Sequence, residues 1–328
     1  MPYQGRFGEP RRSSKGEGGG DPADSTMNGA LIIDKPAGPS SHDVVARVRR
    51  ATAVRRVGHT GTLDPMATGV LVLLLGRATR LARFLGAGEK AYEATVRLGV
   101  ATDTFDAAGR VLPPDRPAPA GPAAVDRAAI EAALAGFRGS FPQTPPPFSA
   151  KRIAGVRAYE LARRRAPVLP PPAIVTVHAL ELTWLEGDRL GLRLVTSGGF
   201  YVRSLAHDLG VRLGGGAHLE ALRRTGTGGF GLGQAVPLAT VEAEGTEALQ
   251  RMIPMADLLP GLPGLVLTER GARRAAHGNA IAAAEVAARL GEPALAGGPI
   301  RLLDPAGALV AIAEPGEGAT LHPVVVLV

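Results

Sequence analysis

The clearest hydrophobic pattern in the chain is the unbroken aliphatic run VLVLLL at residues 70–75, which follows the polar segment VGHTGTLDP. A short apolar run without alternation is typical of a strand buried on both faces. Asp64 lies shortly before this run, so the pattern predicts a carboxylate on an irregular loop at the edge of a rigid sheet. Its neighbours Pro65, Met66 and Ala67 offer no metal ligand, which favours a base or a nucleophile.

Other segments alternate apolar and polar residues and are predicted to be strands with one buried face. In KAYEATVRL, residues 90–98, the alternation places Tyr92 on the face opposite Ala91 and Glu93. The remaining predicted strands are residues 31–33, an antiparallel pair at 174–185 and 190–196, and C-terminal strands near Ile300, Ala308 and Val324.

Helical periodicity and capping residues predict the helices. The first begins after Ser40 or Ser41 and extends to about Thr52, with its valines inward and its arginines in solvent. Further helices are expected at residues 78–85, 125–137, 205–213 and 268–276, with one more helical turn at 218–224.

Glycine and proline punctuation divides the chain. Residues 1–28 hold few apolar anchors and are expected to form a disordered tail. The segment PGLPG at 260–264 is the strongest boundary signal, so we expect a main domain at 29–260 and a small β-rich domain at 264–328. Within the main domain, 113–124 is predicted to be a linker. The proline-rich segment 142–172 is predicted to be a surface insertion with a short helix near 158–165.

The formal charge of +7 is unevenly distributed. Residues 1–28 carry four basic and four acidic side chains, and residues 265–328 carry five basic and six acidic ones. The excess is therefore in the middle of the chain, at 47–56, at Arg77, Arg80 and Arg83, and at 151–165. This distribution predicts a face that binds a phosphate backbone, although an arginine-rich solvated surface is the simpler alternative.

The absence of cysteine excludes thiol catalysis, disulfides and cysteine-ligated zinc. No run of 18 apolar residues is present, and the N-terminus has no apolar signal core. We therefore expect a soluble, cytoplasmic protein that does not contact a membrane.

The segment GHTGTLDP is not a recognised phosphate loop, because it lacks the Lys-Ser/Thr pair and does not have the GxGxxG spacing. His59 and Asp64 could pair in acid–base chemistry, but no serine nucleophile in an elbow motif accompanies them. Taken alone, an acid in such a loop is more often a turn or capping residue than a catalyst.

Five sequence blocks change that assessment: DKPAG, GHTGTLDPMATGVL, KAYEATVRLG with TDTFDAAG, SGGFYVRSLAHDLG, and GAHLEALRRT. In residue type and order they resemble the tRNA pseudouridine-55 synthases of the TruB family. The resemblance implies the α+β pseudouridine synthase fold, with a central mixed, mainly antiparallel sheet, a basic RNA-gripping insertion and a C-terminal PUA-like domain. It implies isomerisation of the uridine at position 55 of the tRNA T-loop, without metal or organic cofactor.

The resemblance also implies roles for individual residues. Asp64 matches the essential aspartate, which attacks or deprotonates the ribose, and Arg203 matches the arginine that pairs with it. An adjacent guanidinium lowers the pKa of a carboxyl group, so we expect an ionised Asp64. Tyr92 matches the tyrosine that stacks on the target base and assists proton removal at carbon 5.

Further matches concern substrate binding. His59 matches a residue that fills the stack vacated by the flipped uridine, Tyr201 a second tyrosine beneath the uracil, and Leu222 an apolar wall. Lys151 matches a basic residue of the insertion. For Asp106 a turn role and an RNA contact stay open, and the segment Lys35-Pro36 is expected to support the Asp64 loop from behind.

The implied partner is the T-arm of tRNA, bound by a monomer that needs no other protein. Two alternatives remain open. One is an RNA-binding folding factor for which the modification is secondary, and the other is the catalytic subunit of a guide-RNA-directed pseudouridylase. The basic insertion favours stand-alone tRNA recognition.

Overall fold

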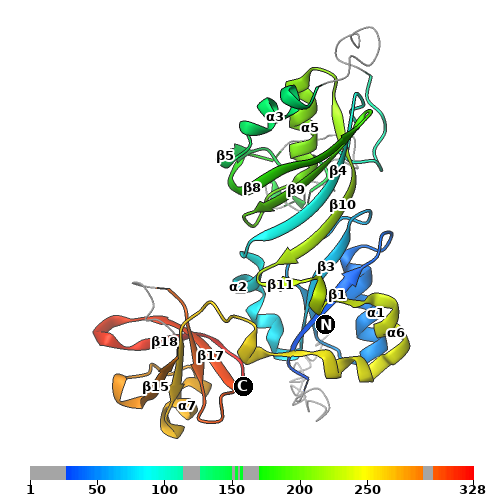
Figure 1. Cartoon of the computed structure of the whole chain (residues 1–328). Helices are drawn as coiled ribbons and strands as arrows, with labels where there is room; N and C mark the ends of the chain where they lie inside the picture. Colours follow the sequence, from blue (N-terminus) through cyan, green and yellow to red (C-terminus); the bar gives the residue numbers. More distant parts are fainter. Residues whose placement is uncertain (1–26, 114–125, 150–151, 154–155, 158–169, 291–297) are drawn as a thin grey trace, which may run out of the picture.

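The computed structural model describes residues 27–113, 126–149, 152–153, 156–157, 170–290 and 298–328. They form one large sheet and a separate five-stranded C-terminal sheet (Figure 1). The large sheet contains β1 (Gly29–Lys35), β2 (Val57–His59), β3 (Thr68–Leu75), β4 (Lys90–Leu98), β5 (Gly139–Gln143), β8 (Ala173–Glu186), β9 (Arg189–Thr196), β10 (Ala217–Thr227), β11 (Phe230–Gly231), β12 (Val236–Pro237) and β13 (Ile253–Pro254). The expected tail up to residue 26, most of the 113–124 linker and the helix near 158–165 lie outside the described residues.

The main strand order is β12-β1-β3-β10-β4-β9-β8-β5. Strands β1 and β12 pair in parallel, as do β3 and β10, whereas the other pairs in this order are antiparallel. The predicted mixed, mainly antiparallel sheet is confirmed. Strand β3 lies inside the sheet between β1 and β10, which confirms the predicted strand buried on both faces, and Asp64 lies on the loop that precedes it.

Burial explains the two hydrophobic patterns. Residues 70–75 of strand β3 are all aliphatic because they alternate between two buried clusters, one on each face of the sheet. Strand β4 alternates because Tyr92, Ala94 and Val96 face one core, whereas Glu93 on the other face is exposed. The predicted orientation of Tyr92 is therefore confirmed.

The helices of the main body are α1 (Ser41–Thr52), α2 (Ala82–Gly86), α3 (Arg127–Ala135), α5 (Val202–Leu213) and α6 (Leu238–Glu244). A capping box between Ser40 and Asp43 starts α1, as the sequence predicts. The segment expected to be a helix at 78–85 is instead a 3-10 helix, η2 (Gly76–Leu81), followed by the short α2. Helices α3 and α5 lie together over the β8–β9 end of the sheet (Figure 1).

The helical turn predicted for residues 218–224 is wrong, since these residues belong to β10. Helix α5 ends at Gly214 in a left-handed conformation, and the chain then reverses into an extended strand paired with β4. Leu222 and Arg224 point inward, whereas Ala221 is exposed, as a strand requires. The predicted start of α5 is also late, because the helix begins at Val202 and so contains Arg203.

The C-terminal sheet consists of β14 (Gly264–Leu267), β15 (Val286–Leu290), β16 (Ile300–Leu303), β17 (Leu309–Pro315) and β18 (Leu321–Val326), with helix α7 (Glu269–Ala276). Thr268 caps α7, and strands lie near the three predicted C-terminal positions. Leu309, Ile312 and Leu327 join a cluster with Leu258 and Leu81 of the main body.

Two arginines assigned from the sequence to a binding face instead join the parts of the chain. Arg77 Nη1 donates to the Leu327 carbonyl over 3.5 Å, and Arg80 Nη1 donates to that of Val326. The backbone N–H of Arg77 also donates to Asn28 Oδ1 over 2.7 Å, so structured contacts begin within the last residues of the expected tail. Across the described residues, no helix has the length and apolarity needed to span a membrane.

Candidate active site

The loop that carries Asp64 is held from two sides. Ser41, on the first turn of α1, donates through Oγ to the Leu63 carbonyl over 3.0 Å and accepts from the Leu63 N–H over 2.8 Å. On the other side, the fully buried Lys35 of β1 donates to three carbonyls, those of Pro36 (2.9 Å), Pro65 (3.2 Å) and Ala67 (2.7 Å). The expectation that Lys35 supports this loop agrees with these contacts.

We expect Lys35→Met to reduce the free energy of unfolding by about 1–3 kcal/mol for each carbonyl left buried without a donor. Burial already lowers the pKa of Lys35 to about 8, and its three acceptors keep the ammonium in place. Denaturant unfolding measures the change. Arg50→Met on the exposed face of α1 is the control and should leave stability within about 0.5 kcal/mol. A Lys35→Met protein as stable as the parent would contradict the pinning role.

Asp64 and Arg203 form the centre of the site. Arg203 Nε lies 2.9 Å from Asp64 Oδ2, and Nη2 donates to Oδ1 over 3.1 Å. The Arg203 side chain is 6% exposed, and that of Asp64 is 32% exposed, so the carboxylate is the part of the pair that faces solvent. The pair predicted from the sequence is therefore present in the structure.

The pKa of Asp64 is raised above its ordinary value, which corrects the expectation that it would be lowered. Burial of the carboxyl group is the largest cause, and the nearby Asp106 adds to it, whereas Arg203 and Lys35 act in the opposite direction. The guanidinium alone would lower the pKa of Asp64, but desolvation of the buried carboxyl group raises it by more. The contacts of both Asp64 oxygens with the Arg203 guanidinium favour the ionised form of Asp64.

Arg203 is itself fixed by the surrounding backbone. Its Nη1 donates to the Thr104 carbonyl over 3.1 Å, and its Nη2 donates to the Phe148 carbonyl over 2.9 Å. Asp106 Oδ2 lies 3.5 Å from Nη1. The other Asp106 oxygen accepts from Thr104 Oγ1 and from the Ala108 N–H, so this buried carboxylate closes a turn and also faces the arginine.

Tyr92 is 6% exposed and lies opposite Arg224, its cross-strand partner on β10. Burial raises the pKa of Tyr92, and the charge of Asp64 contributes in the same direction, which places the ring within electrostatic reach of the carboxylate. The stacking surface expected at Tyr92 is thus largely covered in this structure.

Tyr201 precedes helix α5 and is held through its backbone, which exchanges two hydrogen bonds with the Gln143 amide at 2.8 and 3.0 Å. Burial raises the pKa of Tyr201, and the charge of Asp64 again contributes. His59 packs edge-on against His42, with ring centroids 5.3 Å apart. Burial lowers the pKa of His59, which favours the neutral imidazole.

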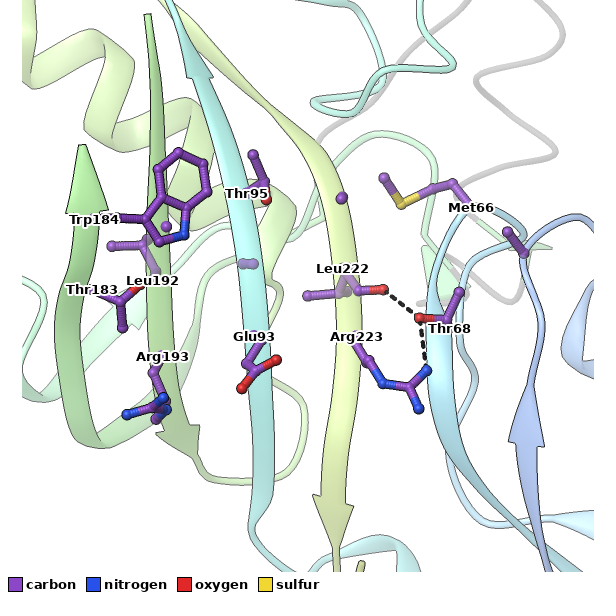
Figure 2. A pocket seen from close by; sticks show the side chains of 14 residues that line it. Met66, Thr68, Glu93, Thr95, Thr183, Trp184, Leu192, Arg193, Leu222 and Arg223 are labelled. Atoms are coloured by element: carbon purple, nitrogen blue, oxygen red, sulfur yellow. Dashed lines mark hydrogen bonds between the residues drawn. The ribbon is translucent and has the colours of Figure 1, made fainter. Parts of the chain in front are cut away.

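The other predicted site residues are less closely associated with the carboxylate. Leu222 belongs to the same buried cluster as Tyr92 and also lines a groove of about 620 Å³. This groove, shown in Figure 2, runs over the exposed side chains of β4, β8, β9 and β10, where Glu93, Thr95, Trp184 and Arg193 gather. Lys151 lies outside the described residues. No cluster of three or more histidine or acidic side chains suited to a metal occurs in the described part of the chain.

Comparison with known proteins identifies the chain. The description "TruB family pseudouridylate synthase (N terminal domain)" matches residues 49–202, and "tRNA pseudouridylate synthase B C-terminal domain" matches residues 203–259. The tRNA pseudouridine synthase B of Solibacter usitatus is 43% identical over 303 residues, which cover 92% of this chain and 100% of that protein. The protein of the same name from Thermobifida fusca is 43% identical over 308 residues, 91% of this chain and 98% of that protein.

The chain belongs to the TruB family. It is therefore an enzyme of the isomerase class that forms pseudouridine.

Solved structures support the TruB-family fold. The "Crystal Structure of a Cbf5-Nop10-Gar1 Complex" aligns with a TM-score of 0.70 and 26% identity, over 93% of this chain and 86% of that chain. The "Structure of H/ACA RNP bound to a substrate RNA containing 2'-deoxyuridine" aligns with a TM-score of 0.69 at 24% identity, over 93% of this chain and 86% of that chain. The predicted pseudouridine synthase fold is confirmed.

Sequence reasoning missed Arg224 and Lys90. Arg224 is 1% exposed, lies opposite Tyr92, and donates to the carbonyls of Val70 (2.7 Å) and Gly61 (3.1 Å). Lys90 Nζ donates to the carbonyls of Gly86 and Gly88, and burial lowers its pKa to about 8. A glycine within a strand often marks a close approach of another backbone, so Gly69 was a sequence signal for the contact with β10. A Cβ at Gly69 would lie 2.2 Å from the Arg224 carbonyl oxygen.

Proposed function

We propose that this enzyme isomerises the uridine at position 55 of the tRNA T-loop, with Asp64 as the group that acts on the ribose. The observation that carries the proposal is the solvent-facing Asp64 carboxylate held by the buried Arg203. Tyr92 and Tyr201 are near enough for the charge of Asp64 to raise the pKa of both hydroxyls. The relatives named tRNA pseudouridine synthase B support tRNA as the substrate.

The chemistry suits a fixed anion. In the reaction the bond between uracil N1 and ribose C1′ breaks, with its electron pair staying on the uracil. The base turns and C5 bonds to C1′. C5 then loses its proton and N1 gains one, so the product is an isomer of the substrate. Bond breaking develops positive charge on the sugar, and a carboxylate already positioned beside it stabilises that charge without reorganisation. Asp64 either adds to the sugar or removes a ribose proton, and the geometry is compatible with both routes.

The target base must leave its stack to reach Asp64. Stacking on an aromatic ring is worth about 1–3 kcal/mol per base, whereas flipping costs a few kcal/mol, so Tyr92 can hold the base but cannot alone extract it. Because Tyr92 is 6% exposed, neighbouring side chains must also shift before a base can lie against the ring. Phosphate contacts elsewhere on the protein supply the remaining free energy.

We assign those contacts to the basic insertion at residues 142–172, of which the structure describes a hairpin formed by β6 (Arg152–Ile153) and β7 (Val156–Arg157). Replacing Lys151, Arg152 and Arg157 by glutamine should weaken tRNA binding. It should also flatten the dependence of log K on log salt by roughly 0.7–0.9 for each phosphate that the protein no longer neutralises. Binding titrations at several salt concentrations measure the slope. Arg193→Gln, on the groove side of β9, should leave it unchanged, and an unchanged slope in the triple variant would exclude this RNA-binding role.

The similarity to Cbf5 in complex with Nop10 and Gar1 keeps a guide-dependent catalytic subunit as the competing function. The two are separated by incubating the purified chain alone with an unmodified tRNA transcript labelled with tritium at uridine C5. Release of tritium without added protein or RNA supports stand-alone action. Release only after a guide RNA is added would favour the competing function.

A further inference from the structure

We propose that Phe105 and His207 form a clasp that positions Arg203 for catalysis, an inference that rests on the proposed role of Asp64. Their rings stack face to face, with centroids 3.8 Å apart and an interplanar angle of 8°. Phe105 lies on the loop between β4 and α3, and His207 lies on α5, so the stack joins two separate elements of the site.

The position of the stack along each element ties it to Arg203. On α5, His207 follows Arg203 by four residues, and side chains with this spacing share one helix face. On the loop, the residues on either side of Phe105 both meet the same guanidinium nitrogen. The Thr104 carbonyl accepts from Arg203 Nη1 over 3.1 Å, and Asp106 Oδ2 lies 3.5 Å from that atom. Arg203 and His207, on one face of α5, therefore contact three successive loop residues, 104–106.

Phe105 adopts a backbone conformation that is unfavourable for its residue type, so the surrounding structure must hold it there. Its φ of +65° lies in the left-handed region, which an aromatic residue rarely adopts. The surrounding turn is anchored by Thr102 Oγ1, which donates to the Asp106 carbonyl over 2.8 Å, and by the Leu219 N–H of β10, which donates to the Phe105 carbonyl over 3.0 Å. Strained backbone of this kind persists when the surroundings fix it, and here they fix the loop that faces Arg203.

The consequence concerns rate rather than RNA affinity. Phe105 and His207 act on Arg203 through the loop and the helix that they join, so they are positioning residues. Without the stack, the loop still closes through its own hydrogen bonds, but Thr104 and Asp106 hold Arg203 less firmly. The Asp64 carboxylate then has a less well-defined orientation toward the ribose.

The test compares variants that separate the ring from the backbone. Phe105→Asn suits the left-handed conformation but removes the ring, whereas Phe105→Tyr retains it. His207→Leu removes the flat face, and His207→Phe retains one. We expect Phe105→Asn and His207→Leu to lower the single-turnover rate at saturating tRNA by roughly tenfold, the value of one aromatic pair. The tRNA dissociation constant should not change, the melting temperature should fall by only about a few degrees, and the tyrosine and phenylalanine variants should restore the rate.

A parental rate in Phe105→Asn would overturn the proposal, as would a rate loss that parallels a fall in melting temperature and is not rescued by the ring-retaining variants. Asp64→Asn in the same assay separates this failure from that of the proposed function. If Asp64→Asn is inactive while Phe105→Asn is fully active, only the clasp is refuted.

Discussion

Asp64→Asn should reduce the single-turnover rate of pseudouridine formation by on the order of 10⁴-fold while leaving the tRNA dissociation constant unchanged. The substitution keeps the shape of the side chain and an oxygen able to accept from Arg203 Nη2, which now bonds to Asp64 Oδ1 at 3.1 Å. It removes the negative charge that the sugar requires as its bond to uracil breaks. Single-turnover kinetics and equilibrium binding with the same tRNA transcript measure the two quantities separately.

Asp188→Asn is the matched control, because Asp188 is also a carboxylate in an ion pair, at 2.9 Å from Arg97, but lies on an exposed turn of the sheet. It should have the parental rate and affinity. A retained rate in Asp64→Asn would remove the carboxylate from the mechanism. A parallel loss of affinity would make Asp64 an RNA-binding residue.

Replacing Arg203 should affect both stability and the pH dependence of the rate. Arg203→Gln removes the guanidinium that contacts both Asp64 and Asp106, and breaking a buried pair in this way costs about 3–5 kcal/mol. Arg203→Lys keeps a charge but not the two-point contact, so it should fold and lose about 10²-fold in rate. Thermal unfolding and single-turnover rates measure these effects.

The sign of the pH effect follows from the ionisation of Asp64. The rate falls as pH decreases through the pKa of Asp64 in the folded enzyme, which burial places above the ordinary value. Arg203 lowers that pKa, so Arg203→Lys should move the acid limb of the pH–rate profile to higher pH. Asp106 raises it, so Asp106→Asn should move the limb to lower pH. Shifts of the same sign in both variants would contradict this electrostatic account.

Much of the fold could be predicted from the sequence, because the spacing of apolar residues shows which faces of a strand or helix are buried. Residues 70–75 of strand β3 are aliphatic at every position because both faces are covered, and β4 alternates because one face is covered. Both were predicted for these reasons. The local pattern at 218–224 misled, because the order of apolar and polar residues there fits a helical turn until the pairing of β10 with β4 is known.

That error concealed a site residue. In a strand, neighbouring residues face opposite ways, so Arg223 bonds to Asp34 at the surface while Arg224 donates to the Val70 carbonyl in the interior. Treated as part of a helix, the two arginines carry no such distinction. The contact between Asp64 and Arg203 spans 139 residues, and no periodicity reports it. Before the structure was known, only the resemblance to a family indicated that Asp64 and Arg203 form a pair.

The direction of the Asp64 pKa could not be derived from sequence either. A partner cation can be inferred from a motif, but desolvation depends on how much protein surrounds the carboxyl group. Here burial outweighs the guanidinium. The same reasoning applies to Tyr92, whose strand and face were predicted but whose ring is more covered than a stacking platform requires.

The most direct test of the account is to map pseudouridine at single-nucleotide resolution in an unmodified tRNA transcript after incubation with the purified chain. We expect the parent protein to modify one uridine, at position 55 in the T-loop, without a guide RNA. We expect no modification after incubation with the Asp64→Asn protein. Modification at another position, or equal modification by the Asp64→Asn protein, would contradict it.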